Sequence, residues 1–250
     1  MNKFACVTGA DRGLGLEIVK QLVARDFTVF AGKYLLKWNL LESFEHPDKV
    51  YIVEIDVADD DSVKKAAQFI LSKTEYLDIL VNNAGMPGKR ETGGTIFDEL
   101  DFDNMLHVYN VNALGAIRMT NALIKPIMAS FHKLIVNISS EAGSISTCWR
   151  YKGFAYCMSK AALNMSSAII HNSLHREFNG QVMDFNPGGM PTHFSTQKSA
   201  DDEMLPPVER QGFTSAEKSA EGIVNHMLEQ ERFKSDHPAF ISYGGNVIPW

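Results

Sequence analysis

The chain has 250 residues, of which 45% are apolar and 22% are charged, a composition typical of an ordinary globular protein. Its formal net charge is −6 and no basic run occurs, so neither nucleic-acid binding nor binding to an anionic membrane is indicated. The three cysteines show no CxxC spacing, and no apolar run has the length of a signal peptide core or a membrane span, which favours a reduced, cytoplasmic setting.

Short apolar runs alternate with longer segments of helical period along most of the chain. Such alternation is typical of βαβ units in a parallel sheet that is covered on both faces. We therefore predict an α/β fold with a doubly wound sheet of about seven parallel strands, in a single domain over residues 1–250. The expected strands are 4–8, 28–31, 50–55, 77–82, 133–139, 181–185 and 239–242, and the expected helices are 13–25, 60–73, 98–128, 155–178 and 214–230.

The first strand is followed at once by a glycine-rich turn, VTGADRGLG, in which Gly9, Gly13 and Gly15 precede a helix. Glycines at such a junction permit a tight turn and let a pyrophosphate approach the helix N-terminus, where free N–H groups and the helix dipole favour anions. Turns also use glycine for other reasons. The strand before and the helix after nevertheless favour a dinucleotide site.

The end of the second strand carries a cation where many dinucleotide sites carry an acid. An NAD site usually has Asp or Glu about 20 residues beyond the glycines, on the ribose 2′-OH. Here no acid occurs from Thr28 to Leu41, and Lys33 stands at the expected place. Together with Arg12 in the glycine turn it suits a 2′-phosphate, so NADP(H) is predicted over NAD(H). The alternative is that both side chains are solvated surface charges.

The stretch AYCMSKAALN (155–164) places Tyr156 four residues before Lys160, and no other tyrosine of the chain has a lysine at this spacing. A helix brings such a pair onto one face, with the Cβ atoms about 5–6 Å apart. A free tyrosine has a pKa near 10, and a neighbouring ammonium stabilises the phenolate. The pair is therefore a candidate acid–base couple; the alternative is an exposed helical pair without function.

With these motifs the sequence resembles the classical short-chain dehydrogenase/reductase family over nearly its whole length. The C-terminal ISYGGNVIPW gives a weaker likeness to a carbonyl-reductase-like branch. The resemblance implies a Rossmann-type fold and hydride transfer between a nicotinamide and a carbonyl or alcohol substrate such as an aldehyde, ketone or quinone. The matching motifs, in the family's order, are TGADRGLG (8–15), DV (56–57), NNAG (82–85), NALG (112–115), ISSEAG (138–143), YCMSK (156–160) and NPGGMPT (186–192).

The resemblance also implies roles for individual residues. Tyr156 is the general acid or base, Lys160 also binds the nicotinamide ribose, and Ser140, rather than Ser139, holds the substrate oxygen. Asn112 locally breaks its helix and holds a water that links Lys160 to solvent. The residues and the resemblance together assign the catalytic roles to Asn112, Ser140, Tyr156 and Lys160, and cofactor binding to Gly9, Arg12, Gly13, Leu14, Gly15, Lys33, Asp56, Val57, Asn83, Ala84, Gly85, Tyr156, Lys160, Pro187, Gly188 and Thr192.

Two departures from the family pattern concern the substrate. Ser140 and Tyr156 are slightly further apart than is usual, so residues 143–154 contain a small insertion whose Trp149, Arg150 and Tyr151 either shape the substrate mouth or anchor the surface. Gly189 follows Gly188, where the family often has a bulky residue.

Residues 190–213 form a long connection, which we interpret as a substrate loop, although a disordered insertion remains the alternative. His171 and His175 have the i, i+4 spacing of metal ligands, but no HExxH motif or obvious third ligand accompanies them, so no metal is predicted.

The rival hypothesis is a catalytically silent NADP(H)-sensing protein of the same fold. Such a sensor has no need of all four catalytic residues, so an active enzyme is favoured. Enoyl reduction, a third possibility, normally uses a wider spacing between tyrosine and lysine. By family habit we expect a homodimer or homotetramer formed through the helices at 98–128 and 155–178.

Overall fold

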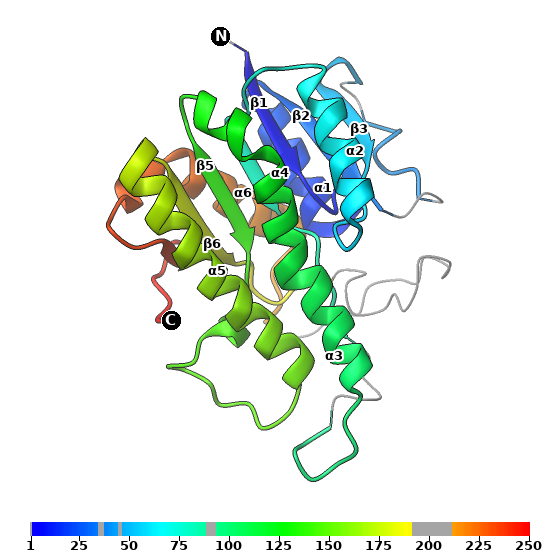
Figure 1. Cartoon of the computed structure of the whole chain (residues 1–250), viewed down its shortest axis with the longest axis vertical. Helices are drawn as coiled ribbons and strands as arrows, with labels where there is room; N and C mark the ends of the chain where they lie inside the picture. Colours follow the sequence, from blue (N-terminus) through cyan, green and yellow to red (C-terminus); the bar gives the residue numbers. More distant parts are fainter. Residues whose placement is uncertain (1, 35–37, 45–46, 89–93, 192–211) are drawn as a thin grey trace.

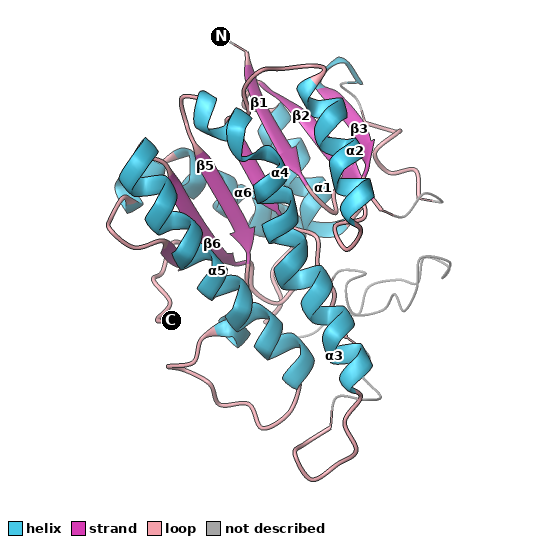
Figure 2. Ribbon diagram, viewed as in Figure 1, coloured by secondary structure: helices cyan, strands magenta, loops and turns pink. Residues whose placement is uncertain are grey.

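The described part of the computed structural model comprises residues 2–34, 38–44, 47–88, 94–191 and 212–250. It contains one sheet of seven parallel strands in the order β3-β2-β1-β4-β5-β6-β7, with helices on both faces (Figures 1 and 2). The predicted fold class is thereby confirmed. The strands are β1 (Lys3–Val7), β2 (Phe27–Lys33), β3 (Val50–Glu54), β4 (Ile79–Asn82), β5 (Leu134–Ile138), β6 (Gln181–Asn186) and β7 (Ala239–Ser242), and the helices are α1 (Gly13–Val23), α2 (Asp60–Leu71), α3 (Phe102–Tyr109), α4 (Gly115–Ala129), α5 (Phe154–Phe178) and α6 (Ala216–Leu228).

Each predicted strand is present; the differences lie at the ends of the elements and in the helix predicted at 98–128, which is divided into α3 and α4. β2 continues beyond the predicted 28–31 because Gly32 and Lys33 still pair with β3. The helix predicted at 98–128 begins only at Phe102, because the side chain of Asp101 accepts the N–H of Asn104 and caps it.

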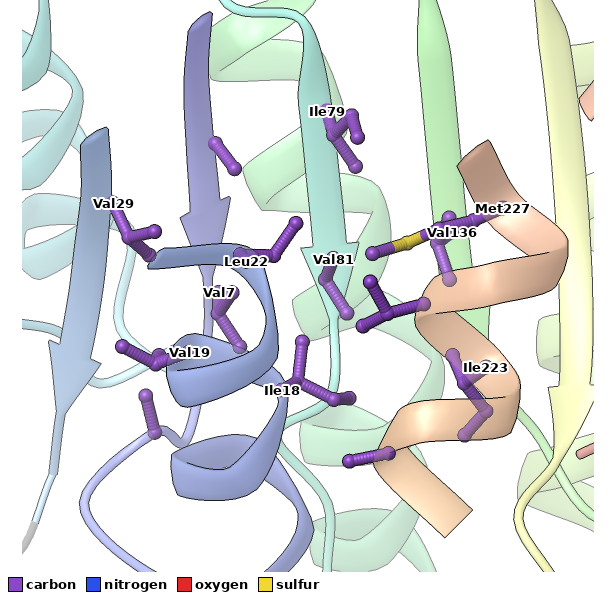
Figure 3. Close-up of a cluster of buried hydrophobic side chains, with 14 of the residues drawn as sticks. Val7, Ile18, Val19, Leu22, Val29, Ile79, Val81, Val136, Ile223 and Met227 are labelled. Carbon is purple, nitrogen blue, oxygen red and sulfur yellow. The ribbon is translucent and has the colours of Figure 1, made fainter. Parts of the chain in front are cut away.

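The two faces of the sheet bury separate apolar clusters. On one face, side chains such as Val7 and Val29 pack against Ile18 and Leu22 of α1 and against α6 (Figure 3). On the other face, Cys6 and its neighbours pack against α2 and α4. The alternation of Cys6 and Val7 between the two clusters follows from the two-residue period of a strand.

The strand order reverses between β1 and β4, which are neighbours in the sheet although β2 and β3 lie between them in sequence. In open parallel sheets, ligands bind in the crevice outside the carboxyl ends of the strands at such a switch point. The glycine-rich turn follows β1, the NNAG motif follows β4, and the serine motif follows β5. The fold therefore brings these three motifs to one edge.

The last residues of the sequence fold back over β7. The N–H of Ile248 donates to the carbonyl oxygen of Phe240 at 2.8 Å, and the rings of Trp250 and Phe240 lie 5.1 Å apart. Among the helices of the described residues, none combines the length and the apolar character needed to cross a membrane.

Candidate active site

The glycine-rich turn between β1 and α1 packs tightly against the end of β4. Gly9 and Gly13 have positive φ angles of 60° and 54°, which glycine adopts readily. A Cβ at Gly15 would lie 2.3 Å from the carbonyl oxygen of Gly9 and 2.5 Å from Asn83 Nδ2, so a larger residue does not fit. Asn83 Nδ2 donates to the carbonyl oxygens of Thr8 and Gly9, each at 2.9 Å. Contacts within the protein therefore fix the shape of the turn.

The N-terminus of α1 opens from this turn and is suited to an anion. The first turn of a helix leaves N–H groups without intrahelical partners, and Leu14 and Gly15 belong to this turn. Arg12 occupies the N-cap position, and its side chain has no acceptor that could bind them. The close-packed glycines and the uncapped helix end thus fit the pyrophosphate of a dinucleotide.

Arg12 is fixed beside the glycine turn and is not freely solvated. Its guanidinium lies 5.0 Å from the ring centre of Trp38 and pairs with Asp11 at 2.9 Å. Burial lowers the pKa of Arg12, while the carboxylate of Asp11 acts in the opposite direction. The guanidinium is therefore positioned at the rim of the site by an aromatic ring and a carboxylate.

Asp56 and Val57 follow β3 at the same edge. The carboxylate of Asp56 accepts the N–H of Ala58 at 2.9 Å, which orders the turn between β3 and α2. Val57 is buried against Gly115, where a Cβ would lie 2.8 Å from its Cγ2 atom. Both residues thus lie in an ordered turn at the carboxyl end of a strand, as the family pattern requires.

Lys33 ends β2 at the expected place, but it is neither free nor solvated. Its side chain is only 8% exposed, and its ammonium forms an ion pair with Glu42. Glu42 directly follows Leu41, where the stretch without acids ends. Because Glu42 lies on a separate turn after the strand, its approach to Lys33 depends on tertiary structure. The ion pair opposes the predicted contact between Lys33 and a 2′-phosphate, which stays a prediction, and the burial excludes the alternative that Lys33 is a solvated surface charge.

Tyr156 and Lys160 lie on one face of α5, as the spacing predicts. The ammonium of Lys160 is 5.8 Å from the centre of the tyrosine ring. The lysine is 4% exposed, and Nζ donates to the carbonyl oxygen of Ile138 at 2.7 Å. Since Ile138 is the last residue of β5, this bond ties the helix to the carboxyl edge of the sheet.

The two serines that follow β5 have different partners. Ser139 is buried, and its hydroxyl donates to Asn164 Oδ1 of α5. Ser140 accepts the N–H of Ala142 at 3.1 Å and shares a hydrogen bond with Tyr156. Ser140 is therefore the serine that meets the tyrosine, whereas Ser139 has a packing role.

The phenol of Tyr156 is buried beside Ser140. Burial raises its pKa above the ordinary value, and the hydrogen bond with Ser140 acts in the opposite direction. Burial also lowers the pKa of Lys160, to about 8, and its ammonium donates to Ile138. Burial therefore opposes the expected acidification of Tyr156 by Lys160, which stays a prediction.

Asn112 interrupts its helix in the way the resemblance implied. It lies in a π-helical turn, η3 (Asn110–Leu114), between α3 and α4. Its Oδ1 accepts the N–H of Met86 at 2.8 Å, and its Nδ2 donates to the Met86 carbonyl oxygen and to Ser159 Oγ, both at 2.9 Å. A Cβ at Gly85 would lie 3.2 Å from Oδ1 and 3.8 Å from Lys160 Nζ. Asn112 thus joins the NNAG segment to α5 close to the lysine.

The segment after β6 explains one departure from the family pattern. Gly188 has a φ angle of 76°, and the carbonyl oxygen of Pro187 accepts the hydroxyl of Ser219 at 2.8 Å. A Cβ at Gly189 would lie 2.8 Å from the ring of Phe213. Phe213 thus fills the space that a bulky side chain at 189 would take. Thr192, and all but the ends of the predicted substrate loop, lie outside the described residues.

The insertion that follows Ser140 is anchored from both sides. Ser144 Oγ donates to the carbonyl oxygen of Pro249 at 2.6 Å, and Arg150 pairs with Glu141 at 2.5 Å. Trp149 and Tyr151 are each 70% exposed. The insertion therefore combines a fixed base with exposed aromatic side chains.

The two histidines of α5 have structural partners. Their rings stack with centres 5.1 Å apart, and Nδ1 of the buried His171 accepts the N–H of Val182. Within the described ranges, no group of three or more His, Cys, Asp or Glu side chains is placed to hold a metal.

The structure also contains polar partners that sequence reasoning missed. Glu42 lies just beyond the acid-free stretch from Thr28 to Leu41, and nothing in the sequence distinguishes Ser159 from an ordinary helix residue. Asp184 was visible as the single acid within an apolar strand candidate, QVMDF, which was a usable signal.

Comparison with known proteins identifies the family. The model described as short chain dehydrogenase matches residues 3–203. An uncharacterized oxidoreductase of Schizosaccharomyces pombe is 30% identical over 259 residues, covering 100% of this chain and 98% of the relative. Retinol dehydrogenase 7 of Mus musculus is 30% identical over 199 residues, covering 78% of this chain and 58% of the relative.

Among solved structures, the NADPH-bound carbonyl reductase from chicken fatty liver has a TM-score of 0.82 and 28% identity, covering 100% of this chain and 99% of that one. The resemblance to the carbonyl-reductase-like branch is confirmed by this similarity. The chain therefore belongs to the short chain dehydrogenase family, whose members are oxidoreductases acting on CH–OH or C=O groups.

Proposed function

We propose that the chain is an NADP(H)-dependent oxidoreductase that transfers a hydride between nicotinamide and a carbonyl or alcohol substrate, with Tyr156 as the general acid or base. One observation carries this proposal: Ser140, Tyr156 and Lys160 converge at the carboxyl end of β5, at the sheet edge that also bears the glycine-rich turn. When bound, the nicotinamide would supply the hydride for reduction or accept it for oxidation.

Tyr156 acts as the proton donor in carbonyl reduction. Because burial keeps the pKa of its phenol above 10, the group is protonated at neutral pH and its proton is available to the substrate oxygen. In alcohol oxidation the same group must first lose its proton, which is harder at neutral pH.

Ser140 and Lys160 support this proton transfer. The hydroxyl of Ser140 shares a hydrogen bond with Tyr156, so it is in place to bind the same substrate oxygen and to stabilise developing negative charge. The ammonium of Lys160, directed at the end of β5, would hold the nicotinamide ribose. Asn112 connects the NNAG segment to α5 beside it.

The preference for NADP(H) is supported by two cations at the far end of the crevice, Arg12 and Lys33. The ion pair between Lys33 and Glu42 opposes it, because a 2′-phosphate must compete with this carboxylate. NAD(H) is therefore the alternative cofactor. The carboxylate of Glu42 would accept a hydrogen bond from the ribose 2′-OH of NAD(H), whereas it would repel the 2′-phosphate of NADP(H). The NADPH bound in the chicken carbonyl reductase structure supports the first choice.

We propose aldehydes, ketones and quinones as substrates. The carbonyl reductase and retinol dehydrogenase among the similar proteins support a carbonyl or alcohol group, and the exposed Trp149 and Tyr151 in the insertion after Ser140 favour apolar substrates if they line the substrate mouth.

The rival proposal is a silent NADP(H)-sensing protein, and one assay separates the two. The purified chain is mixed with NADPH and a panel of aldehydes, ketones and quinones, and the absorbance of the reduced nicotinamide is followed. The enzyme predicts substrate-dependent loss of absorbance for at least one compound. NADPH binding, shown by fluorescence, with no consumption on any member of the panel would favour the sensor.

A further inference from the structure

A carboxyl group lies buried in the sheet directly behind the catalytic helix. Asp184 belongs to β6, is 0% exposed, and is paired in register with Asn137 of β5. Figure 1 shows β5 and β6 side by side with α5 along them. An acid in the middle of a central strand is rare, because burying a charge is unfavourable unless it has a counter-charge or hydrogen bonds.

The hydrogen bonds of Asp184 satisfy only one of its oxygens. Oδ1 accepts from Ser167 Oγ at 2.7 Å and from Asn137 Nδ2 at 3.1 Å. Oδ2 is buried and has no hydrogen-bond partner among the described residues. Packing and hydrogen bonding alone therefore do not account for an acid at this position, since an asparagine or serine could make the Oδ1 contacts.

Among the described residues, Lys160 brings a positive charge to the same place in the sheet. Its Nζ donates to the carbonyl oxygen of Ile138 at 2.7 Å, and Ile138 directly follows Asn137, the residue that is paired with Asp184 and bonded to it. The carboxylate raises the pKa of the lysine, and the ammonium lowers the pKa of the acid, while burial has the opposite and larger effect on each. β5 contributes only the amide of Asn137, and β7 carries no titratable side chain. The other titratable group of α5 near β6, His171, is bonded to the backbone of Val182 and Ser235.

We propose that Asp184 is a positioning residue for the reaction: it is the buried counter-charge that keeps Lys160 an ammonium beside Tyr156. The inference rests on the proposed function of Lys160 and extends it to a residue in the sheet that touches neither substrate nor cofactor.

The proposal predicts a direction for the effect of removing the charge. Lys160 has a pKa of about 8, and Tyr156 has one above 10, so the lysine loses its proton first as the pH rises. Without the carboxylate, the pKa of the lysine falls further. Carbonyl reduction that requires the ammonium then fails at a lower pH.

The test is the pH dependence of kcat/KM for carbonyl reduction in Asp184→Asn, which removes the charge and keeps an oxygen for Ser167 and Asn137. We expect the alkaline limb to move down by about one pH unit. Ser167→Ala, which removes a bond that favours the charged acid, should move it in the same direction by less. The matched control is Asp78→Asn, a buried acid at the opposite edge of the sheet whose carboxylate accepts the N–H of Phe4 at 2.9 Å.

The control separates the proposed role from a structural one. Loss of a merely structural acid would lower stability in both Asp variants without moving the limb in either. An alkaline limb that stays in place in Asp184→Asn, with the wild type active, would overturn the proposal. A limb that moves equally in Asp78→Asn would also overturn it.

A second readout needs no turnover, so it remains informative if the proposed enzymatic activity fails. The free energy of unfolding is measured for Asp184→Asn, Lys160→Met and the double variant. An attraction between the two charges predicts that the double variant loses less stability than the two single variants together. Strict additivity would contradict it.

The pH dependence of the free energy of unfolding provides a further test, because the direction of its change can be predicted. The folded-state pKa of Asp184, about 7, is raised above its ordinary value of 3.8, so its contribution to stability is present below 3.8 and is lost as the pH rises to about 7. The stability of Asp184→Asn relative to wild type should therefore increase over this window. A difference that is constant with pH would mean that Asp184 does not titrate there.

Discussion

Tyr156 and Lys160 differ in how firmly they hold their protons. Burial raises the pKa of the phenol and lowers that of the amine to about 8. Near neutral pH the phenol is therefore protonated, while a small rise in pH is enough to deprotonate the ammonium. The group of the pair that is more sensitive to pH is thus the lysine, although the tyrosine is the proposed proton donor. If the rate of reduction falls as the pH rises above neutral, we expect the first fall to come from deprotonation of Lys160.

At the cofactor end, the proposed NADP(H) preference makes Glu42 the residue that competes with a 2′-phosphate for Lys33. Its carboxylate occupies Lys33, so Glu42→Gln should release the ammonium and tighten NADPH binding by about tenfold, or ~1.4 kcal/mol, with little effect on NADH. Titration of both cofactors by fluorescence measures this ratio. Glu17→Gln is the matched control, because Glu17 pairs with the exposed Lys20 on the outer side of α1. An unchanged ratio in Glu42→Gln would show that Lys33 does not meet the phosphate.

The sequence predicts single residues only where the contact is local. The i, i+4 spacing placed Tyr156 and Lys160 correctly, because a helix of any context brings them together. The partners of Lys33 and Lys160 are on other elements: Glu42 returns through a turn after β2, and Asp184 reaches α5 only because β6 lies beside β5. No local sequence pattern predicts that Glu42 lies beside Lys33 or that Asp184 lies near Lys160.

At the scale of elements, the polar interruption between α3 and α4 organises the site. The π-helical turn directs Asn112 toward Met86 and Ser159, so three segments distant in sequence share one side chain. The sequence predicted one continuous helix here from its period, and only the family resemblance indicated a break. A single π turn is only five residues long, which is too short to stand out in the period of a helix of this length.

Loss of this side chain should destabilise the protein. Asn112→Ala leaves the Met86 N–H and C=O and the Ser159 hydroxyl without their shared partner, so the free energy of unfolding should fall by about 1–3 kcal/mol. Asn110→Ala is the control, because that side chain makes a single weaker bond, at 3.3 Å, to Ala58. Urea denaturation measures both. Equal losses in the two variants would refute the bridging role.

At the scale of the whole molecule, the described residues include an exposed apolar face on α3 and α5. The two helices pack together, and five large apolar side chains on them are between 60% and 68% exposed. Isolated exposed apolar residues are common, but contiguous ones mark interaction surfaces. This apolar face consists of Phe102, Leu106, Met158, Met165 and Ile169.

We expect this apolar face to join copies of the chain into the predicted homodimer or homotetramer. Met165→Glu places a charge in its centre and should shift the protein toward monomer in analytical ultracentrifugation, with the fold retained by circular dichroism. Leu71→Glu, on the exposed side of α2, is the matched control and should leave the mass unchanged. A wild-type protein that is monomeric at micromolar concentration would exclude this assembly.

The overall architecture was the most predictable level of the molecule. Alternating strands and helices fix a parallel sheet, and right-handed crossovers leave few possible strand orders, so β1 and β4 meet where the glycine turn predicts a ligand. What the sequence could not give was the side-chain environment at this edge: the raised pKa of Tyr156, the paired Lys33 and the ring of Phe213 over Gly189 all depend on how distant segments pack.

The central claim is that Tyr156 donates the proton in carbonyl reduction, and one comparison tests it most directly. The kcat for reduction of an active carbonyl substrate and the dissociation constant for NADPH are measured for wild type and Tyr156→Phe. The phenyl ring keeps the packing and removes the acid, so the account predicts a loss of at least about 100-fold in kcat with NADPH affinity unchanged. A Tyr156→Phe enzyme that keeps the wild-type kcat would contradict it.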